Sequence, residues 1–341
     1  MTAFVTDFLP TPIGPVPQVA TSPSAQDRMG TLFARIGFTR NQYQVSPGLY
    51  AVGHPASDAP FLVTANYKLS FDALRFNLDG VDAWLLVIDT RGINVWCAAG
   101  KGTFSTEEVI FSVEQTGIKE INKRPTLILP QLAATGVCAL KVEKGCGVRA
   151  LFGPILTRDL PQFLQENTAT EEMRCVTFTM RERAVLIPVE LYLLFRPFGL
   201  FALAAFLFSG IGPDIFSFSH AWQRGLVFMQ ATILGLFSGS FLVPILLPWL
   251  YGRQFWVKGL WPGLVLGALF AAGRAGQSTL LEQLALFLLI TTISSYQGMH
   301  FTGCTPFTSL SGVDYEMRRG IPFQMLLLMV GFMLWISAPF I

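Results

Sequence analysis

The stretch Ala83-Trp-Leu-Leu-Val-Ile-Asp89 is apolar up to its final aspartate and predicts the most deeply buried strand of the chain. The turn Asp89-Thr-Arg-Gly92 follows it directly. Two further apolar runs of strand length, Phe61 to Asn66 and Thr126 to Pro130, lie before and after it, with stretches of helical spacing between them. Apolar strands that alternate with helices predict a mostly parallel sheet that is covered on both faces.

The elements around this strand define where a ligand is expected. A helix is predicted over Thr103 to Thr116, where Ser105 and Glu108 have the spacing of a capping box. A fourth strand is expected within Gly147 to Leu156. Ligands of such sheets bind beyond the carboxyl ends of the strands. The loop after Asp89 therefore lies in the expected binding region.

The charged residues are unevenly distributed along the chain. Only 13% of the 341 residues are charged, whereas a soluble domain has about 25%. Residues 1–184 hold 17 Lys/Arg and 17 Asp/Glu, and the rest of the chain holds 7 and 5. This distribution predicts a soluble front half joined to a membrane-embedded back half. The net charge of +2 is too small to indicate a nucleic-acid-binding surface, so no nucleic-acid partner is expected.

Four regions are predicted from these patterns. Residues 1–40, with a run of prolines, are expected to form an extended Pro-rich arm. Residues 41–166 are expected to form the soluble α/β domain, 167–185 a linker, and 186–341 an all-α transmembrane domain. The N-terminal stretch lacks the basic region of a secretory signal, so the front domain is expected in the cytoplasm.

The back half contains five apolar segments of spanning length, since about 20 apolar residues cross a bilayer as a helix. They are placed near 189–209, 226–250, 256–273, 280–299 and 321–340. Pro244 and Pro248 predict a kink or break near the end of the second segment. The spacings Gly235-x-x-x-Gly239 and Gly263-x-x-x-Gly267 would let helices approach closely.

The loop charges predict the orientation in the cell membrane. Arg174, Arg181 and Arg183 precede the first predicted span, and Arg318 and Arg319 precede the last. The positive-inside rule then places the front domain in the cytoplasm and the C-terminus outside, which agrees with five spans. Few ionisable residues lie deep within the predicted spans, so a membrane anchor is favoured over a transporter.

One segment stands out for its chemistry, Asn94-Val-Trp-Cys-Ala-Ala-Gly-Lys101, which follows the strongest strand. The small residues in and after it would let the backbone approach a bulky ligand closely. The chain has five cysteines and no C-x-x-C pair, which predicts a reducing compartment and no disulfide framework or iron–sulfur cluster of its own.

Three interpretations of this segment follow from the residues alone. A Walker phosphate loop is not supported, because Val95 and Gly102 occupy the positions that need glycine and Ser/Thr. A nucleophilic Cys97 would need a base, for which His54 is the only histidine of the front half. Alternatively, Cys97 is a buried small apolar residue, which is common for a free cysteine. The residues leave the last two interpretations open.

The segment Asn94 to Lys101 closely resembles the signature of the corrinoid membrane protein of microbial mercury methylation. A soluble domain followed by about five spans also matches the layout of that family, so the resemblance covers nearly the whole chain. The front domain is similar to the corrinoid-binding domain of the corrinoid iron–sulfur protein of the acetyl-CoA pathway. In that relative a Thr-x-Asn stretch after a strand lies close to the cofactor, and Thr64-Ala-Asn66 fits this pattern. The resemblance implies a Rossmann-like corrinoid-binding domain followed by five transmembrane helices.

The resemblance also implies the roles of particular residues. The segment would form a cap helix beneath the corrin ring, with the Cys97 thiolate as catalytic residue and ligand of the cobalt. No Asp-x-His-x-x-Gly sequence exists for the histidine-ligated mode. A thiolate donates electrons more strongly than an imidazole, which favours departure of a methyl group as a carbanion equivalent toward Hg(II). The implied cofactor-binding residues are Thr64, Asn66, Asn94, Val95, Trp96, Cys97, Ala98, Ala99, Gly100, Lys101, Gly102 and Thr103.

The implied activity is a corrinoid-dependent methyltransferase that converts Hg(II) to methylmercury. Its implied partners are a small ferredoxin-like protein with two 4Fe–4S clusters, which restores Co(I), and a methyltransferase that supplies the methyl group from a folate. Two other functions stay open: a transporter or receptor with a cofactor- or metal-sensing soluble domain, and a corrinoid methyltransferase with another acceptor. The remaining cysteines are expected to be structural rather than a mercury relay; they are Cys138, Cys146, Cys175 and Cys304.

Overall fold

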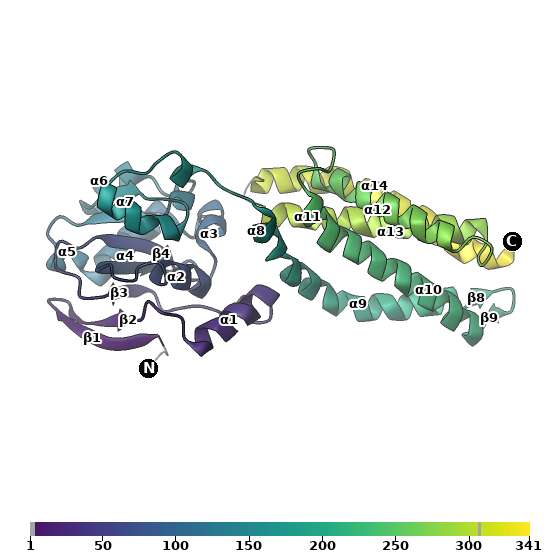
Figure 1. The fold of residues 1–341 in the computed structure, drawn as a ribbon, viewed down its shortest axis with the longest axis horizontal. Helices are drawn as coiled ribbons and strands as arrows, with labels where there is room; N and C mark the ends of the chain where they lie inside the picture. Colours follow the sequence, from purple (N-terminus) through teal and green to yellow (C-terminus); the bar gives the residue numbers. More distant parts are fainter. Residues whose placement is uncertain (1–3, 306–307) are drawn as a thin grey trace. The chain divides into compact units, whose positions relative to one another are not determined.

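The chain divides into two units, Met1–Thr177 and Phe178–Ile341, of which the first is a mixed α/β domain and the second is helical (Figure 1). The computed structural model describes residues 4–305 and 308–341, except for the side chains of residues 194–198, 304 and 310. The first unit is called unit 1 and the second unit 2.

Unit 1 is built on one seven-stranded sheet with the order β1-β2-β3-β5-β4-β6-β7. Strands β5, β4, β6 and β7 run parallel, whereas β3 is antiparallel to β5 and β1 is antiparallel to β2. The sheet is therefore mixed, with the predicted parallel part as its larger half. The predicted strands are all present. The strands are β1 (Val5–Thr11), β2 (Gly14–Val19), β3 (Gly48–Val52), β4 (Phe61–Ala65), β5 (Ala83–Ile88), β6 (Thr126–Leu129) and β7 (Arg149–Phe152).

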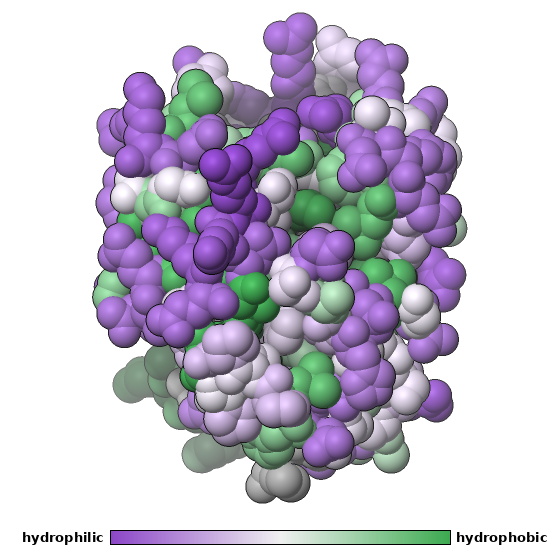
Figure 2. Space-filling model, turned by 90° about the vertical axis from the view of Figure 1, so that its left-hand side faces the viewer, coloured by the Kyte–Doolittle hydropathy of each residue, from purple (hydrophilic) through white to green (hydrophobic). Residues whose placement is uncertain are grey.

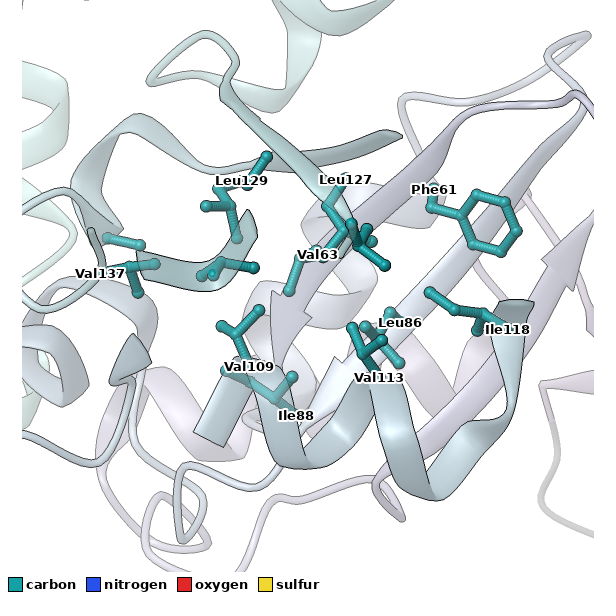
Figure 3. Close-up of a cluster of buried hydrophobic side chains, with 14 of the residues drawn as sticks. Phe61, Val63, Leu86, Ile88, Val109, Val113, Ile118, Leu127, Leu129 and Val137 are labelled. Atoms are coloured by element: carbon teal, nitrogen blue, oxygen red, sulfur yellow. The ribbon is translucent and has the colours of Figure 1, made fainter. Parts of the chain in front are cut away.

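Helices cover both faces of this sheet, as the alternation of strands and helices predicts. Phe61, Val63 and Leu86 face a core cluster with Val109 of α4 (Figure 3). Their neighbours in sequence face a second cluster formed with α2 and α7, because successive strand residues point to opposite faces. The helices are α1 (Ala25–Ile36), α2 (Lys68–Arg75), α3 (Val95–Lys101), α4 (Thr106–Thr116), α5 (Ile118–Ile121), α6 (Ala139–Cys146) and α7 (Leu160–Glu166).

The first forty residues are folded, so the prediction of an extended Pro-rich arm is wrong. Strands β1 and β2 form a hairpin at the edge of the sheet, in which Pro10 pairs with Pro15. β1 is the edge strand and β2 pairs with β3 only at Gln18, so the prolines of both strands have one side that needs no hydrogen-bond donor. Helix α1 begins at a capping box formed by Ser24 and Asp27 and ends at Gly37, which has a φ of 111°. A domain boundary at residue 41 would divide unit 1.

Three buried charges and the partly buried Lys68 fix α1 to α2. The Asp27 carboxylate lies 2.8 Å from Lys68 Nζ and 2.8 Å from Arg75 Nη2, and Asp72 pairs with the same two cations at 2.7 and 2.8 Å. Burial acts to raise the pKa of Asp27, but the hydrogen bonds from Lys68, Ser24 and Arg75 outweigh it and hold the pKa well below its usual range. The ionised network therefore stabilises the position of α1.

Unit 2 consists of apolar helices. Four segments of its described residues are long and apolar enough to cross a membrane: Phe218–Leu246, Phe255–Gly273, Leu280–Gly303 and Ser311–Phe340. The first predicted span lies within α9, whose C-terminal stretch Gly199–Ser209 forms a shorter apolar helix among the described residues, so five spans stay a prediction. The elements are α8 (Met180–Ala184), α9 (Ile187–Ser209), β8 (Ile211–Gly212), β9 (Ile215–Phe216), α10 (Phe218–Phe237), α11 (Val243–Leu246), α12 (Phe255–Gly273), α13 (Leu280–His300) and α14 (Leu310–Ser337).

The surfaces of the two units differ in polarity. Figure 2, which views unit 1 from the left of Figure 1, shows a mainly hydrophilic face with small, separated apolar patches. Unit 2 exposes many large apolar side chains on its helices, among them Leu200, Leu269 and Met333. Such a surface is unfavourable in water and suits contact with lipid.

The second predicted span is interrupted where its prolines predict a break. Helix α10 passes into a π-helical turn at Ser238–Leu242 and then into the short α11, which contains Pro244. Proline frees a backbone carbonyl within a helix. Pro248 lacks the N–H that would bond to the carbonyl four residues before it, which is that of Pro244. The buried Arg183 Nε donates to this Pro244 carbonyl oxygen at 2.6 Å.

Helix α13 is held close to α10 and α12 by glycines, and both predicted Gly-x-x-x-Gly pairs face it. A Cβ at Gly239 or at Gly259 would lie 2.6 Å from the Ser294 carbonyl oxygen, and one at Gly263 would lie 2.7 Å from the Ser294 Cβ. The Ser294 hydroxyl also bonds to the Gly259 carbonyl at 2.6 Å and to the Ser238 hydroxyl at 2.8 Å. Small residues and hydroxyl groups therefore join these helices.

Replacing Asp27 with asparagine tests the charge network. We expect Asp27→Asn to lower the free energy of unfolding by about 3–5 kcal/mol at pH 7, because it leaves two cations with one carboxylate. A carboxyl whose pKa is lowered by folding stabilises the protein above its unfolded pKa, so the difference should shrink as the pH falls below about 4. Urea unfolding of the full chain in detergent measures it. Asp58→Asn, at an exposed position, is the control, and equal losses in both variants would contradict the account.

Candidate functional site

The candidate site lies where two neighbouring parallel strands end at the same edge of the sheet. Thr64 of β4 is paired with Val87 of β5, and Ala65 with Ile88. The chain continues from β4 into Asn66 and from β5 into the turn Asp89 to Gly92 and then α3. This is the edge at which the sequence predicts a ligand.

Asn66 holds the turn between β5 and α3. Its side-chain oxygen accepts hydrogen bonds from the Thr90 N–H (3.0 Å), the Thr90 hydroxyl (2.9 Å) and the Gly92 N–H (2.9 Å). Its side-chain nitrogen donates to Asp89 Oδ1 at 2.9 Å. The same Asp89 oxygen accepts from the Arg91 N–H at 2.8 Å. Asn66 is only 2% exposed, so this amide positions the loop instead of facing a ligand freely.

Helix α3 divides the predicted motif into a capping residue, a buried side and an exposed side. Asn94 caps its N-terminus, because its side-chain oxygen accepts from the Cys97 N–H at 2.9 Å. Ala98 and Ala99 are buried in the core of unit 1, and Val95 packs against that core. The remaining motif residues are partly or fully exposed: Trp96, Cys97, Gly100 and Lys101. The Cys97 thiol is free and partly exposed.

The small residues of the motif serve different purposes. Ala98 and Ala99 let α3 lie against the core of the sheet. The chain also approaches α3 closely at Gly136, because a Cβ there would come 2.9 Å from the Ala99 carbonyl oxygen. Gly102 ends the helix with a φ of 76°, a left-handed conformation that favours glycine. Thr103 then turns back, with its N–H bonded to the Ala98 carbonyl at 2.9 Å. Ligand access is therefore limited to the exposed side of the helix.

Helix α4 begins directly after this turn and confirms only part of the predicted capping box. The Ser105 hydroxyl accepts from the Glu108 N–H at 3.2 Å, as predicted. The Glu108 side chain instead lies beside Asp89. Burial raises the pKa of Glu108, and the Asp89 carboxylate raises it further. The Glu108 side chain therefore interacts with the turn at Asp89 and does not form the reciprocal half of the capping box.

A segment between α1 and β3 forms one wall of the site. The Val45 N–H bonds to the Asn66 carbonyl, and the Lys68 N–H bonds to the Tyr43 carbonyl, both at 2.9 Å. Gln44 covers the turn, since a Cβ at Gly92 would lie 2.2 Å from Gln44 Nε2. The charge network at α1 thereby supports this wall.

Tyr67 is a site residue that the sequence reasoning missed. It is buried, and its hydroxyl has no hydrogen-bond partner among the described residues. Burial raises the pKa of Tyr67, Arg40 and Arg35 lower it, and Cys97 lies within electrostatic range of the hydroxyl. The signal was its position directly after Thr64-Ala-Asn66, but only the fold shows that it lies toward α3.

The geometry excludes His54 as the base for a Cys97 nucleophile. The His54 N–H bonds to Asp82 Oδ1 at 2.8 Å, and Asp82 directly precedes β5. Cys97 follows the opposite end of that six-residue strand, which is about 20 Å long. The two side chains therefore lie at opposite edges of the sheet.

The other cysteines differ in their surroundings. Cys146 is buried, its thiol bonds to the Val142 carbonyl oxygen at 3.2 Å, and burial raises its pKa. This agrees with the structural role expected of it. Cys138 and Cys175 are exposed, and the side chain of Cys304 lies outside the described residues.

Cys97 offers a single soft ligand. No group of three or more His, Cys, Asp and Glu that could hold a metal ion is found among the described residues. One sulfur on an exposed helical turn suits a metal whose other coordination positions are filled by a cofactor.

Comparison with known proteins gives this site a context. Residues 37–163 match the family model of the CO dehydrogenase/acetyl-CoA synthase delta subunit. The gamma subunits of the acetyl-CoA decarbonylase/synthase complex from Methanopyrus kandleri, Archaeoglobus fulgidus and Methanocaldococcus jannaschii are also similar. They are 35%, 33% and 37% identical over 131, 135 and 130 residues, which is 37%, 39% and 38% of this chain. The chain spans only 28%, 28% and 26% of those relatives.

The family match contains the whole candidate site. It runs from before β3 to beyond β7 and includes Asn66, Tyr67 and α3. It leaves out the β1–β2 hairpin, α1 and all of unit 2. The similarity therefore concerns the part of unit 1 that positions Cys97.

Replacing Asn66 with aspartate tests its hold on the turn. Asn66→Asp keeps the shape, removes the donor to Asp89 and sets two carboxylates against each other. We expect the free energy of unfolding to fall by about 2 kcal/mol or more and trypsin to cleave faster after Arg91. Asn122→Asp is the matched control, because its oxygen still accepts from the Arg124 N–H. Unchanged cleavage in Asn66→Asp would contradict the role.

Proposed function

We propose that the chain is a corrinoid-dependent methyltransferase in which the Cys97 sulfur binds the cobalt of the corrinoid. The observation that carries the proposal is the partly exposed thiol on α3, a helix capped by Asn94 at the carboxyl edge of β4 and β5. The match of residues 37–163 to a subunit of the CO dehydrogenase/acetyl-CoA synthase family supports the proposed cofactor. The resemblance of the front domain to the corrinoid iron–sulfur protein of the acetyl-CoA pathway supports the same cofactor.

The residues of the site fit such a group. A corrinoid brings its cobalt within its own ring, so one protein ligand would be enough, and the free, partly exposed Cys97 thiol could supply it. A Cβ at Gly100 would meet no atom within 4 Å, so this side of α3 is open to a bulky ligand. The Tyr67 hydroxyl is a buried polar group that still lacks a partner, and a bound group with a polar edge would provide one.

Each residue of the site then has a physical task. When bound, the corrinoid supplies the methyl group and the cobalt–carbon chemistry. Cys97 would hold the corrinoid through its sulfur and would donate electron density to the metal. Asn94 fixes the turn that presents the sulfur, and Asn66 fixes the loop before it. Tyr67 is kept as a neutral phenol by burial, which raises its pKa, and its hydroxyl can donate a hydrogen bond to the bound group or to the sulfur.

For the substrate we propose Hg(II), with methylmercury as the product. The support is the segment Asn94 to Lys101, which resembles the signature of the corrinoid membrane protein of mercury methylation. The same resemblance supports a small ferredoxin-like partner with two 4Fe–4S clusters and a folate-dependent methyltransferase as methyl donor. It also supports a cytoplasmic unit 1 and a unit 2 that anchors the chain in the cell membrane by five spans.

The names of the similar gamma subunits suggest a second candidate acceptor of the methyl group. Their names place them in the acetyl-CoA decarbonylase/synthase complex, so the methyl group could pass to a protein of such a complex and not to Hg(II). The lack of any match for unit 2 to the family model favours a different assembly. Transport is less favoured than methyl transfer. The Ser294 and Ser295 hydroxyls of α13 are polar groups within the apolar unit, but they donate to carbonyl oxygens of α12 and thus join the two helices instead of lining a path.

Substitution of Cys97 tests the proposed function. The purified full chain is reconstituted with methylcobalamin without oxygen and given Hg(II). We expect Cys97→Ala to change the visible spectrum of the bound cobalt and to lose methylmercury formation, whereas Cys97→His keeps a fraction of it through a nitrogen ligand. Cys175→Ala, at an exposed cysteine, is the control.

The outcomes separate the hypotheses. A chain that retains no stoichiometric corrinoid would refute the cofactor. Spectra that are the same in the native protein, Cys97→Ala and Cys97→His would refute ligation by Cys97. A Cys97-dependent spectrum without methylmercury would leave the corrinoid and refute Hg(II) as the substrate.

A further inference from the structure

Unit 2 contains a groove made of two adjoining cavities between α9, α13 and α14. Their volumes are about 350 and 280 Å³. Both are lined by Phe201 of α9, Leu289 of α13, and Met325 and Leu328 of α14, so they form one elongated space. We call it the α9–α14 groove. The larger cavity, which reaches Trp335, is lined almost wholly by apolar side chains.

Three polar side chains line the smaller cavity, of which Tyr296 is 40% exposed and the other two are buried. Thr292 and Gln324 line it and are 5% and 3% exposed. In the described part of the chain, neither Thr292 Oγ1 nor Gln324 Oε1 has a hydrogen-bond partner. The Gln324 side-chain nitrogen is occupied, since it donates to the Ser295 hydroxyl at 2.9 Å. Buried polar atoms without partners are costly within an apolar helix bundle.

These two atoms define what would satisfy them. Gln324 Oε1 can only accept a hydrogen bond, so the missing partner must be a donor. The Thr292 hydroxyl can donate one to the same partner. A single hydroxyl group of a ligand meets both demands, whereas an ester, an ether or a ketone cannot donate to Gln324.

The shape of the groove defines the rest of the ligand. From Gln324 to Trp335 the groove follows α14 for about 16 Å, at 1.5 Å per residue. Apolar walls over such a length suit one hydrocarbon chain. Arg318 and Arg319 of α14 lie less than two turns beyond Gln324, away from Trp335. The Trp335 end also lies close to a charge, because the Arg224 guanidinium is 4.4 Å from the Trp335 ring. Arg224 is already paired with Glu282, so the buried polar atoms without partners are what distinguish the Gln324 end.

We propose that the α9–α14 groove binds a single-chain lipid with a free hydroxyl, held between Thr292 and Gln324. The chain of the lipid lies along Leu328 toward Trp335. A monoacylglycerol and an isoprenoid alcohol share this chemistry. The site involves no residue of unit 1 and does not depend on the function proposed for Cys97.

Photolabelling of the full chain in detergent micelles tests the proposal. The probe is a long-chain primary alcohol with a diazirine in its chain, and its methyl ether is the matched compound. We expect the alcohol to label peptides of α13 and α14, and the ether to label them about fivefold less, because a lost hydrogen bond in such a site reduces affinity several-fold.

Variants on one helix localise the effect. Thr292→Val removes the free hydroxyl with little change of shape and should reduce labelling by the alcohol about fivefold. Thr291→Val is the matched control, because the Thr291 hydroxyl already bonds to the Phe287 carbonyl at 2.8 Å. Ala204→Phe fills the larger cavity, which Ala204 lines, and should reduce labelling by both compounds.

Equal labelling by alcohol and ether, or labelling that Thr292→Val leaves unchanged, would overturn the proposal. It would mean that the groove takes only apolar chains and that water satisfies the polar pair. Competition by unlabelled monoacylglycerol or by an isoprenoid alcohol would support the site and identify the source of the hydroxyl. Competition by neither would overturn it.

Discussion

The candidate site depends on the hydrogen bonds of the buried Asn66 side-chain amide. This amide joins the ends of β4 and β5 and uses its oxygen and nitrogen to fix the turn from Asp89 to Gly92. Because α3 follows that turn at once, the position of Cys97 is set by one buried side chain of a neighbouring strand. The small residues Ala98 and Ala99 then seat the helix on the core, which leaves only one side of it for a ligand.

The proposed chemistry follows from the small number of metal ligands that the site offers. The candidate site presents the Cys97 thiol, a phenol without a partner in the described structure and an open helix side around Gly100. One thiol is too few protein ligands to hold a metal ion alone, but it suits a cofactor that already binds its metal through ligands of its own. The similarity of residues 37–163 to subunits of acetyl-CoA-forming complexes ends before unit 2. In this chain the matched region is joined to an apolar helical unit that lies outside the match.

Much of this could be predicted from the sequence, because strong local patterns carry it. The apolar run before Asp89 predicted β5, and the prolines 244 and 248 predicted the break after α10. The N-terminal hairpin was missed because its prolines, which disfavour a central strand, are tolerated at the sheet edge. Tyr67 was missed because it gains its place through a long-range contact with the wall before β3. His54 was a candidate base because it is the only histidine of the front half. It is excluded because it lies at the start of β5, whereas Cys97 follows the end of that strand.

X-ray absorption spectroscopy at the cobalt edge tests the central claim most directly. The full chain, reconstituted with a corrinoid under anaerobic conditions, is compared with Cys97→Ala. The account predicts one sulfur neighbour of cobalt in the native protein and none in the variant, with the corrinoid still bound in both. A native spectrum with only nitrogen and oxygen neighbours, or a sulfur signal that survives in Cys97→Ala, would contradict it.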